Sequence, residues 1–293
     1  MHPYSPEGLN PTLPTIDALR RGAGTEEIFQ APCYKCDEFH NLHLDLGPIQ
    51  GTIVREETAL GISEGRTKEI AILSRVGKWV CFQVLGFDQH GNAILSRRRA
   101  QAEARSYFLS ALCPGDVIPA VVQNATPIGV FCDIGCGFTA LMRIDRCCIS
   151  RLDSANQLFS TGQPIHGAIL AVDDVAGQIL LTGRELLGTW EENASQFRPG
   201  QTVTGIVRSI MPYGVFIELT SNLSGLAEPG IPLAEGDAVS VHIRAIQHDR
   251  HKLKLTVIEK LPQPIRAKLQ YTICRGHLDK WEYYPGSTAV TYF

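Results

Sequence analysis

Apolar and polar residues alternate with a period of two along most of this chain, which is the spacing of strands with one buried face. One clear stretch has apolar residues at Val215, Ile217 and Leu219, and similar runs surround Val241 and Leu255. Each unit of about 70 residues holds four or five such runs, which suits a small closed barrel better than a sandwich of twice the length. The pattern therefore predicts an all-β protein made of short antiparallel strands.

The alternating units are copies of one another. The stretch GDVIPAVVQNATPIGVFCDIG, from Gly115, aligns without gaps with GQTVTGIVRSIMPYGVFIELT, from Gly200. The block GQPIHGAILAVDDVAGQILLT, from Gly162, likewise matches GDAVSVHIRAIQHDRHKLKLT, from Gly236. A divergent copy lies upstream, where HNLHLDLG, from His40, matches IGVFCDIG. The repeats predict three tandem five-stranded barrels.

The segments between the copies change from a strand period to a helical one, and each predicts a linker helix packed on the barrels. The apolar stripes are Ala100, Ala104, Tyr107 and Ala111 in the first segment, and Leu187, Trp190, Ala194 and Phe197 in the second. The predicted division is an arm at 1–23, a divergent first barrel at 24–98, a linker helix at 99–113, a second barrel at 114–183, a linker helix at 184–198, a third barrel at 199–262 and an extension at 263–293.

Alternation also predicts which side chains point out of each barrel. If Val215 and Ile217 point inward, Phe216 and Glu218 point outward. The same register exposes Phe131 with Asp133 in the second copy, and His43 with Asp45 in the first, so each copy presents a ring followed by an acid. In the third copy Tyr213 stands at the start of the same strand, and the outward members of the last two strands are His242, Arg244, Lys252 and Lys254.

A Phe that points outward lacks the stabilisation of about 1.5–3 kcal/mol that burial in the core would give, and a nucleobase stacked on it contributes about 1–3 kcal/mol. Rings beside cations on one face therefore predict a platform for single-stranded nucleic acid. The alternative is that linker helices or neighbouring barrels cover these rings.

The run V-x-G-x-V-x-x-I-x-x-Y-G-V-F-I-E-L, from Val203 to Leu219, with SGLAE at 224–228, resembles the RNA-binding domain of the ribosomal protein S-one family, a five-stranded OB-fold. The resemblance implies binding of single-stranded RNA through two rings on the second strand, a His ending the third, and an Asp and an Arg around the last hairpin. Those positions hold Tyr213, Phe216, Glu228, Gln247 and Lys252 in the third copy; Ile128, Phe131, Arg143, Asp173 and Gln178 in the second; and His40, His43 and Val54 in the first. Arg143 would substitute for the His as a phosphate or stacking contact.

Composition excludes one simple route to nucleic acid. Among 293 residues, 27 are Lys or Arg and 30 are Asp or Glu, a formal charge of −3. A global positive field is absent, so binding has to come from local sites and from several weak modules acting together. The densest positive run, Arg97, Arg98 and Arg99, begins the first linker helix and is either an RNA or ribosome contact or a solvated helix start.

Candidate chemistry is sparse. Cys33, Cys36, His40 and His43 are zinc-ligand types, but three residues between the pairs is far short of the dozen or so in a zinc finger, which favours hairpin residues over a metal site. The nine cysteines are scattered through apolar segments, which predicts reduced thiols. Phosphate-binding glycine loops, nucleophile elbows and zinc-protease helices are missing from the sequence, so we expect neither an enzyme nor a cofactor.

The two ends differ from the repeats. The arm at 1–23 is rich in Pro and Gly and is expected to be disordered or a docking arm, with at most a short helix at 15–21. The extension is expected to form a hairpin that turns at 276–279, with aromatic residues that cap the third barrel or form a second contact surface. The apolar runs are of strand length, which predicts a soluble cytosolic protein.

Two functions are consistent with these patterns. The first is a protein that binds single-stranded RNA, mRNA at the small ribosomal subunit in particular, with no membrane or small-molecule substrate as partner. The second is a protein scaffold that docks on the ribosome or on a ribonuclease and touches RNA little or not at all.

Overall fold

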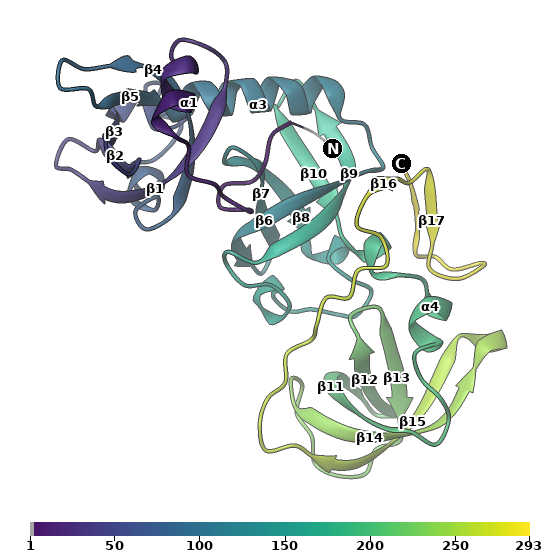
Figure 1. The fold of residues 1–293 in the computed structure, drawn as a ribbon. Coiled ribbons are helices and arrows are strands. Elements are labelled where there is room, and N and C mark those ends of the chain that lie inside the picture. Colours follow the sequence, from purple (N-terminus) through teal and green to yellow (C-terminus); the bar gives the residue numbers. More distant parts are fainter. Residues whose placement is uncertain (1–2) are drawn as a thin grey trace.

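Three closed β-barrels follow one another along the chain in the computed structural model, which describes residues 3–293 (Figure 1). The strands of the first barrel are β1 (Ile28–Cys36), β2 (Leu42–Asp45), β3 (Gln50–Ile53), β4 (Trp79–Phe87) and β5 (Ala93–Ser96). The second barrel contains β6 (Asp116–Thr126), β7 (Gly129–Gly135), β8 (Phe138–Arg143), β9 (Pro164–Asp173) and β10 (Gln178–Thr182). The third contains β11 (Thr202–Met211), β12 (Gly214–Thr220), β13 (Leu223–Ala227), β14 (Ala238–Gln247) and β15 (Lys252–Lys260).

All three barrels have the same connectivity. The first three strands form a meander, and the fifth strand lies between the third and the fourth. The third strand pairs with the fifth in parallel, as β3 with β5, β8 with β10 and β13 with β15. The first strand then closes the barrel on the fourth. This is the five-stranded OB-fold barrel, so the predicted fold class is confirmed.

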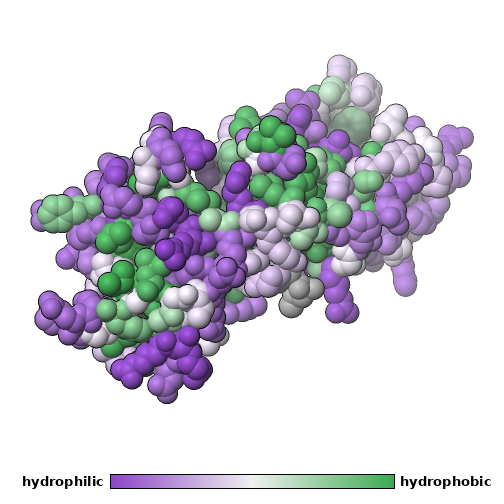
Figure 2. Space-filling model, turned by 90° about the horizontal axis from the view of Figure 1, so that it is seen from above, coloured by the Kyte–Doolittle hydropathy of each residue, from purple (hydrophilic) through white to green (hydrophobic). Residues whose placement is uncertain are grey.

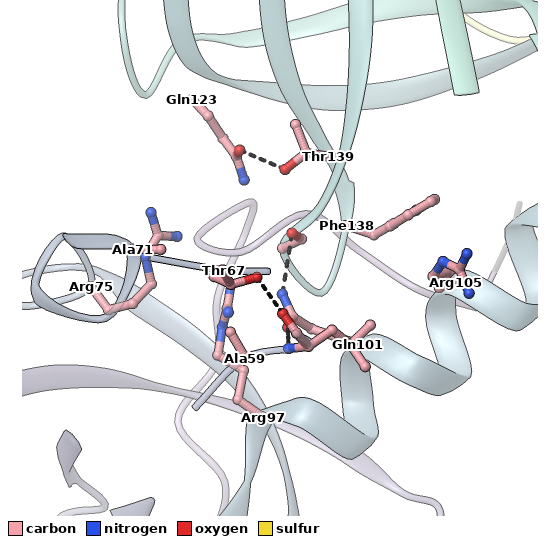
Figure 3. A pocket seen from close by; sticks show the side chains of 12 residues that line it. Ala59, Thr67, Ala71, Arg75, Arg97, Gln101, Arg105, Gln123, Phe138 and Thr139 are labelled. Atoms are coloured by element: carbon pink, nitrogen blue, oxygen red, sulfur yellow. Dashed lines mark hydrogen bonds between the residues drawn. The ribbon is translucent and has the colours of Figure 1, made fainter. Parts of the chain in front are cut away.

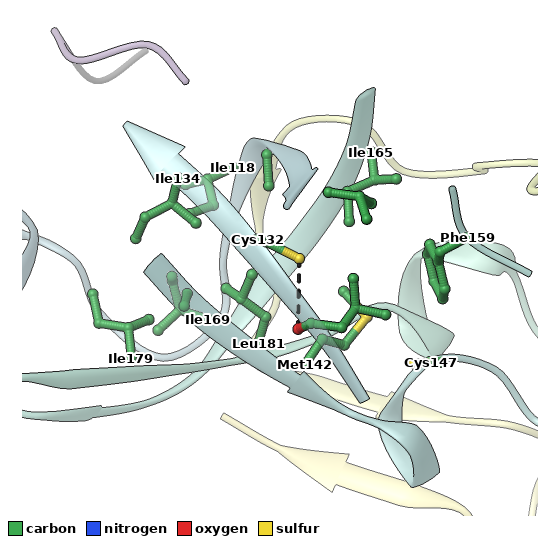
Figure 4. Packing of buried hydrophobic residues seen from close by; sticks show 14 of the residues in the cluster. Ile118, Cys132, Ile134, Met142, Cys147, Phe159, Ile165, Ile169, Ile179 and Leu181 are labelled. Atoms are coloured by element: carbon green, nitrogen blue, oxygen red, sulfur yellow. Dashed lines mark hydrogen bonds between the residues drawn. The ribbon is translucent and has the colours of Figure 1, made fainter. Parts of the chain in front are cut away.

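The predicted inward residues form the barrel cores. Cys132 and Ile134 are fully buried in the second barrel, as are Ile217 and Val241 in the third. Figure 4 shows Cys132 in the middle of the second core, with apolar side chains from the surrounding strands pointing toward it. A period of two therefore placed these core residues correctly.

The first linker is the long helix α3 (Arg97–Ala111), which runs along the first and second barrels (Figure 1). It begins where the Ser96 hydroxyl accepts a hydrogen bond from the Arg99 amide, an N-cap. Its buried apolar residues are Ala100, Ala104 and Phe108, so the apolar face passes through Phe108 rather than through the predicted Ala111, which is exposed.

The second linker is shorter than its apolar stripe suggests. A 3-10 turn at Arg184–Leu187 is followed by α4 (Trp190–Ala194), and Gly188, with a φ of 84°, separates the two. A capping box between Thr189 and Glu192 begins α4. Trp190 and Ala194 are buried as the stripe predicts.

The N-terminal arm lies against the first two barrels. It includes α1 (Ile16–Arg21), and a further short helix, α2 (Ile70–Leu73), lies between β3 and β4. The Cys136 amide of the second barrel donates to the Ser5 carbonyl oxygen. The side chain of Glu7 is buried and accepts two hydrogen bonds from Arg97.

The C-terminal extension differs from the predicted hairpin. The expected turn instead includes β16 (Gly276–His277), which pairs with β6 at the edge of the second barrel. The hairpin lies later, between β17 (Lys280–Glu282) and β18 (Val290–Tyr292). Residues 269–273 alternate like a strand but pack on the second barrel without joining a sheet.

Aromatic residues of the extension do cover part of the third barrel. Trp281 and Tyr283 are buried against Trp190, Leu223 and Leu253. The Tyr283 hydroxyl donates to the Asn222 carbonyl oxygen. The extension thereby connects the second linker to the third barrel.

Candidate nucleic-acid interface

The third barrel has a groove on its outer face. It encloses about 590 Å³ and is lined by β12, β13, β15 and the hairpin between β14 and β15. The groove brings together five of the six residues predicted on this barrel, which are Tyr213, Phe216, Arg244, Lys252 and Lys254. His242 is half-buried and lies outside the groove, on the part of β14 that pairs with Thr202 and Thr256.

The two rings in the groove lie at right angles. Tyr213 is 66% exposed and Phe216 is half-buried, with ring centroids 6.3 Å apart and an interplanar angle of 89°. Tyr213 lies in the turn between β11 and β12, and Phe216 is on β12. A half-exposed ring on a barrel strand offers a face to which a flat base can stack.

The groove is strongly positive in a chain that is negative overall. Four cations line it, which are Arg244, Arg250, Lys252 and Lys254. The only carboxylate in that lining is Glu228, whose Oε1 lies 3.6 Å from Nη1 of Arg244. The local excess of positive charge supplies the field that the net charge of −3 does not.

Of the three acids predicted beside the rings, Asp45 of the first barrel is exposed, whereas Glu218 and Asp133 are not at the surface. Glu218 is buried, and its Oε2 accepts a 2.8 Å hydrogen bond from Nε of Arg208. Asp133 is buried under the N-terminal arm and accepts hydrogen bonds from the backbone amides of Glu7, Gly135 and Gly137. Alternation placed both carboxylates outside the barrel cores correctly, but the prediction that they face solvent was wrong because other segments cover them.

The second barrel places its two predicted residues on one face. Phe131 is half-buried and pairs with Leu141, while Arg143 pairs with Gly129. This register makes Phe131 and Arg143 diagonal neighbours. Arg143 is exposed, and its Nε lies 3.1 Å from Oδ1 of Asp145.

In the first barrel the histidines lie near carboxylates. His43 Nε2 is 3.1 Å from Asp37 Oδ2, and His40 Nε2 is 3.7 Å from a Glu69 carboxylate oxygen. Burial raises the pKa of the Cys33 and Cys36 thiols, which disfavours the thiolate form that a metal requires. Across residues 3–293, no group of three His, Cys, Asp or Glu side chains is placed to hold a metal ion.

The arginine run divides between two environments. Arg97 is buried, with Nε 2.6 Å from Oε1 of Glu7, and Arg98 Nη2 lies 2.5 Å from Oε1 of Glu57. Arg99 is exposed. Burial alone would raise the pKa of Glu7, but Arg97 and Arg75 hold it below its usual value. We therefore leave Arg97 out of the interface, because its guanidinium is committed to Glu7.

A small pocket beside this ion cluster lies between the first two barrels. In Figure 3, Gln101 reaches from α3 toward the turn that precedes Phe138, the first residue of β8. The Gln101 side chain accepts from the Leu60 amide of the first barrel and donates to the Gly137 carbonyl oxygen of the second. The pocket is thus part of a contact between barrels.

Sequence reasoning missed two lining residues of the third-barrel groove, Arg250 and His251. Both lie in the hairpin between β14 and β15, and His251 has a φ of 50°. A left-handed residue leaves the alternation of a strand, so a period of two could not place its ring. The HDRH segment at 248–251 was the available signal, since the S-one motif uses the same hairpin.

The surface contains separate hydrophobic patches within a mostly hydrophilic exterior on the face shown in Figure 2. No helix in the described part of the chain is long and apolar enough to cross a membrane. The nine cysteines are free, and six of them are buried.

Fold and groove together define a class, that of tandem OB-fold proteins with a ring-and-cation groove. Within it, the chain is similar to the small ribosomal subunit protein bS1 of several bacteria. It is 26% identical to that of Rhizobium meliloti (strain 1021) over 64% of this chain and 36% of the relative. It is 26% identical to the bS1 homolog of Bacillus subtilis (strain 168) over 62% and 52%, and 27% identical to bS1 of Staphylococcus aureus (strain COL) over 70% and 57%. These matches confirm the resemblance to the S-one family, and they span about a third to little more than half of each relative.

No protein-family model matches the chain. Among solved structures, a multidomain protein with nucleic acid binding domains from Streptococcus pneumoniae is 17% identical, with a TM-score of 0.28 over 80% of this chain and 74% of that one.

Proposed function

We propose that this chain is a non-enzymatic RNA-binding protein that holds single-stranded RNA, in particular mRNA at the small ribosomal subunit in the cytoplasm. The observation that carries the proposal is the groove of the third barrel, where four cations and two rings face one open space around a single carboxylate. The similarity of the chain to proteins named as small ribosomal subunit components supports a role at the ribosome.

In the proposed complex, Tyr213 and Phe216 stack bases while Arg244, Lys252 and Lys254 contact phosphates. Stacking tolerates every base because each has a flat π-face, so the expected selectivity is for an unpaired strand rather than for a sequence. The ammonium groups of lysines and the guanidinium groups of arginines neutralise the phosphates of the RNA backbone.

Phe131 and Arg143 of the second barrel would supply a weaker second contact, with Arg98 and Arg99 nearer the first barrel. Linked weak sites gain affinity through effective concentration, which fits a chain whose barrels are joined by short linkers.

The scaffold alternative is favoured by one observation. Glu228 occupies the position where the S-one motif has its His, and it lies within ion-pair distance of Arg244, one of the groove cations. If Glu228 neutralises the groove enough, the barrel would bind a protein rather than RNA.

A salt titration separates the two functions. Single-stranded RNA gives a slope of about −0.7 per phosphate contact in a plot of log affinity against log salt, so the three proposed phosphate contacts, Arg244, Lys252 and Lys254, predict a slope of about −2. A labelled oligo(U) strand and fluorescence anisotropy suffice for the measurement. A slope near zero, or no binding at low salt, would support the scaffold.

Two variants test the residues. Phe216→Leu keeps an apolar side chain in the barrel wall but removes the flat ring, and Tyr213→Ala removes an exposed ring. Each should weaken binding about 5- to 150-fold, the equivalent of 1–3 kcal/mol. Tyr292→Ala is the matched control, since Tyr292 is 72% exposed and lies in the C-terminal hairpin, away from the groove. Equal effects of all three variants would contradict the site.

A further inference from the structure

A crevice of about 360 Å³ lies where the second barrel, the third barrel and the C-terminal extension meet. Three of its lining residues, Phe216, Ser224 and His251, also line the third-barrel groove. The two hollows are therefore neighbours that share a wall.

The crevice is held open by fixed contacts between the barrels. The Ile149 amide donates to Oδ1 of Asn222, and the Ser150 amide donates to the Ser221 carbonyl oxygen. The hydroxyls of Ser150 and Ser224, one from each barrel, lie 3.2 Å apart. These bonds attach the loop after β8 to the third barrel, so the crevice walls come from both.

A buried arginine in the crevice wall has an unused donor. The Arg208 side chain is only 7% exposed, and its Nε donates to Glu218. Nη1 donates to Gln157 Oε1 at 3.4 Å, whereas the buried Nη2 has no hydrogen-bond partner among the described residues. Leaving a buried donor unpaired costs about 1–3 kcal/mol, which a phosphate oxygen would recover.

The remaining lining has the chemistry of a nucleotide site. Arg151, 72% exposed, supplies a second guanidinium at the rim, and Ser150, Ser209 and Ser224 supply hydroxyls. No Asp or Glu lines the crevice. Glu218 pairs with Arg208 from outside the lining, and Oδ1 of Asp153 lies 4.0 Å from Nε of Arg151, so the capacity to bind an anion rests on the unpaired Nη2 of Arg208 and on the hydroxyls.

Aromatic rings form the other wall. His251 stacks on Tyr284 of the C-terminal extension, with centroids 4.2 Å apart and an interplanar angle of 11°. Trp190 meets the His251 ring edge to face at 5.2 Å. The backbone at His251 is left-handed, with a φ of 50°.

We propose that this crevice is a second RNA subsite, which takes a phosphate on Arg208 and Arg151 and a base against the His251 and Tyr284 rings. The strand leaves the third-barrel groove past Phe216 and enters the crevice. This inference rests on the proposed function, and it assigns the C-terminal extension a direct part in binding.

The test compares two lengths of fluorescein-labelled oligo(U) on the full chain, a 6-mer that the groove can hold and a 12-mer that reaches the crevice. Arg208→Ala would leave Glu218 unpaired and could unfold the barrel, so the variants are Arg151→Gln and Tyr284→Leu, which lie nearer the rim. Arg66→Gln, at an arginine 77% exposed on the first barrel, is the control.

Each variant should bind the 12-mer about 5- to 10-fold more weakly than the wild type, with the 6-mer changed less than twofold. A 12-mer can bind in more positions than a 6-mer, but this difference cancels because each variant is compared with the wild type on a strand of the same length. If Tyr213→Ala weakens both lengths while Arg151→Gln and Tyr284→Leu bind the 12-mer like the wild type, the subsite is refuted and the groove stands. If the wild type binds neither strand, both proposals fail.

Discussion

The contact between the N-terminal arm and α3 gives a quantitative test of how the first two barrels are held together. Glu7 accepts two hydrogen bonds from Arg97, at 2.6 and 2.8 Å, and one each from Arg75 Nη1 and the Cys81 amide, both at 3.1 Å. The side chains of Glu7 and Arg97 are 4% and 5% exposed. Glu7→Ala therefore leaves a buried guanidinium without its main partner.

Breaking a buried pair in this way costs about 3–5 kcal/mol. Each 1.36 kcal/mol is a factor of ten in an opening equilibrium, so amide hydrogen exchange in α3 and β4 should accelerate roughly 10²- to 10⁴-fold. Exchange followed by mass spectrometry resolves these two elements in the intact chain.

Two further variants isolate the cause. Glu64→Ala removes an exposed glutamate that lies 3.9 Å from Arg66, and it should change exchange by less than about fivefold because surface pairs are worth about 0–1 kcal/mol. Glu7→Ala combined with Arg97→Met should recover much of the loss, since no unpaired charge remains. An acceleration below tenfold in Glu7→Ala would refute the view that this pair fastens the arm to α3.

Three further predictions concern stability. Burial first, and then the carboxylate of Glu7, raises the pKa of Asp133 to about 7. The stabilising contribution of Asp133 to the free energy of unfolding is therefore fully present below its unfolded pKa of about 4, and it is lost as the pH rises through 7. Wild type should therefore lose stability relative to Asp133→Asn between pH 4 and pH 8 in urea denaturation, and a difference independent of pH would contradict the assignment. Gly129→Ala would place a Cβ 2.2 Å from the Met142 carbonyl oxygen at a φ of 149°, and should cost at least about 2 kcal/mol, whereas Gly230→Ala, with open space around it, should be nearly neutral in the same assay. Trp281→Ala should cost about 3–5 kcal/mol of packing and speed limited proteolysis within 276–293, and an unchanged cleavage rate would show that the extension is held by other contacts.

The barrels and their inner faces could be predicted because a period of two and an internal repeat are local properties of the sequence. Val215 and Ile217 are inward in the structure for the reason the alternation gave. The groove residues Phe216 and Arg244 followed from the same register, whereas Tyr213 was proposed from its place at the start of the strand.

What covers an outward residue depends on segments far away in sequence, and that information is not local. The partner of Arg97 is Glu7, 90 residues earlier. The strand pairing of the extension joins Gly276 to Val117, and residues 269–273 have a strand-like alternation with no sheet edge to join. The ring of His251 was unpredictable because a left-handed turn takes it out of register.

The central claim is that single-stranded RNA lies on the third barrel, and photo-crosslinking tests it most directly. The purified 293-residue chain is irradiated with 4-thiouridine-labelled oligo(U), and the crosslinked peptides are mapped by mass spectrometry. Crosslinks should concentrate in peptides containing Tyr213 and Phe216 and in the hairpin at 247–254. Crosslinks confined to the first barrel, or none above a bovine serum albumin control, would contradict the account.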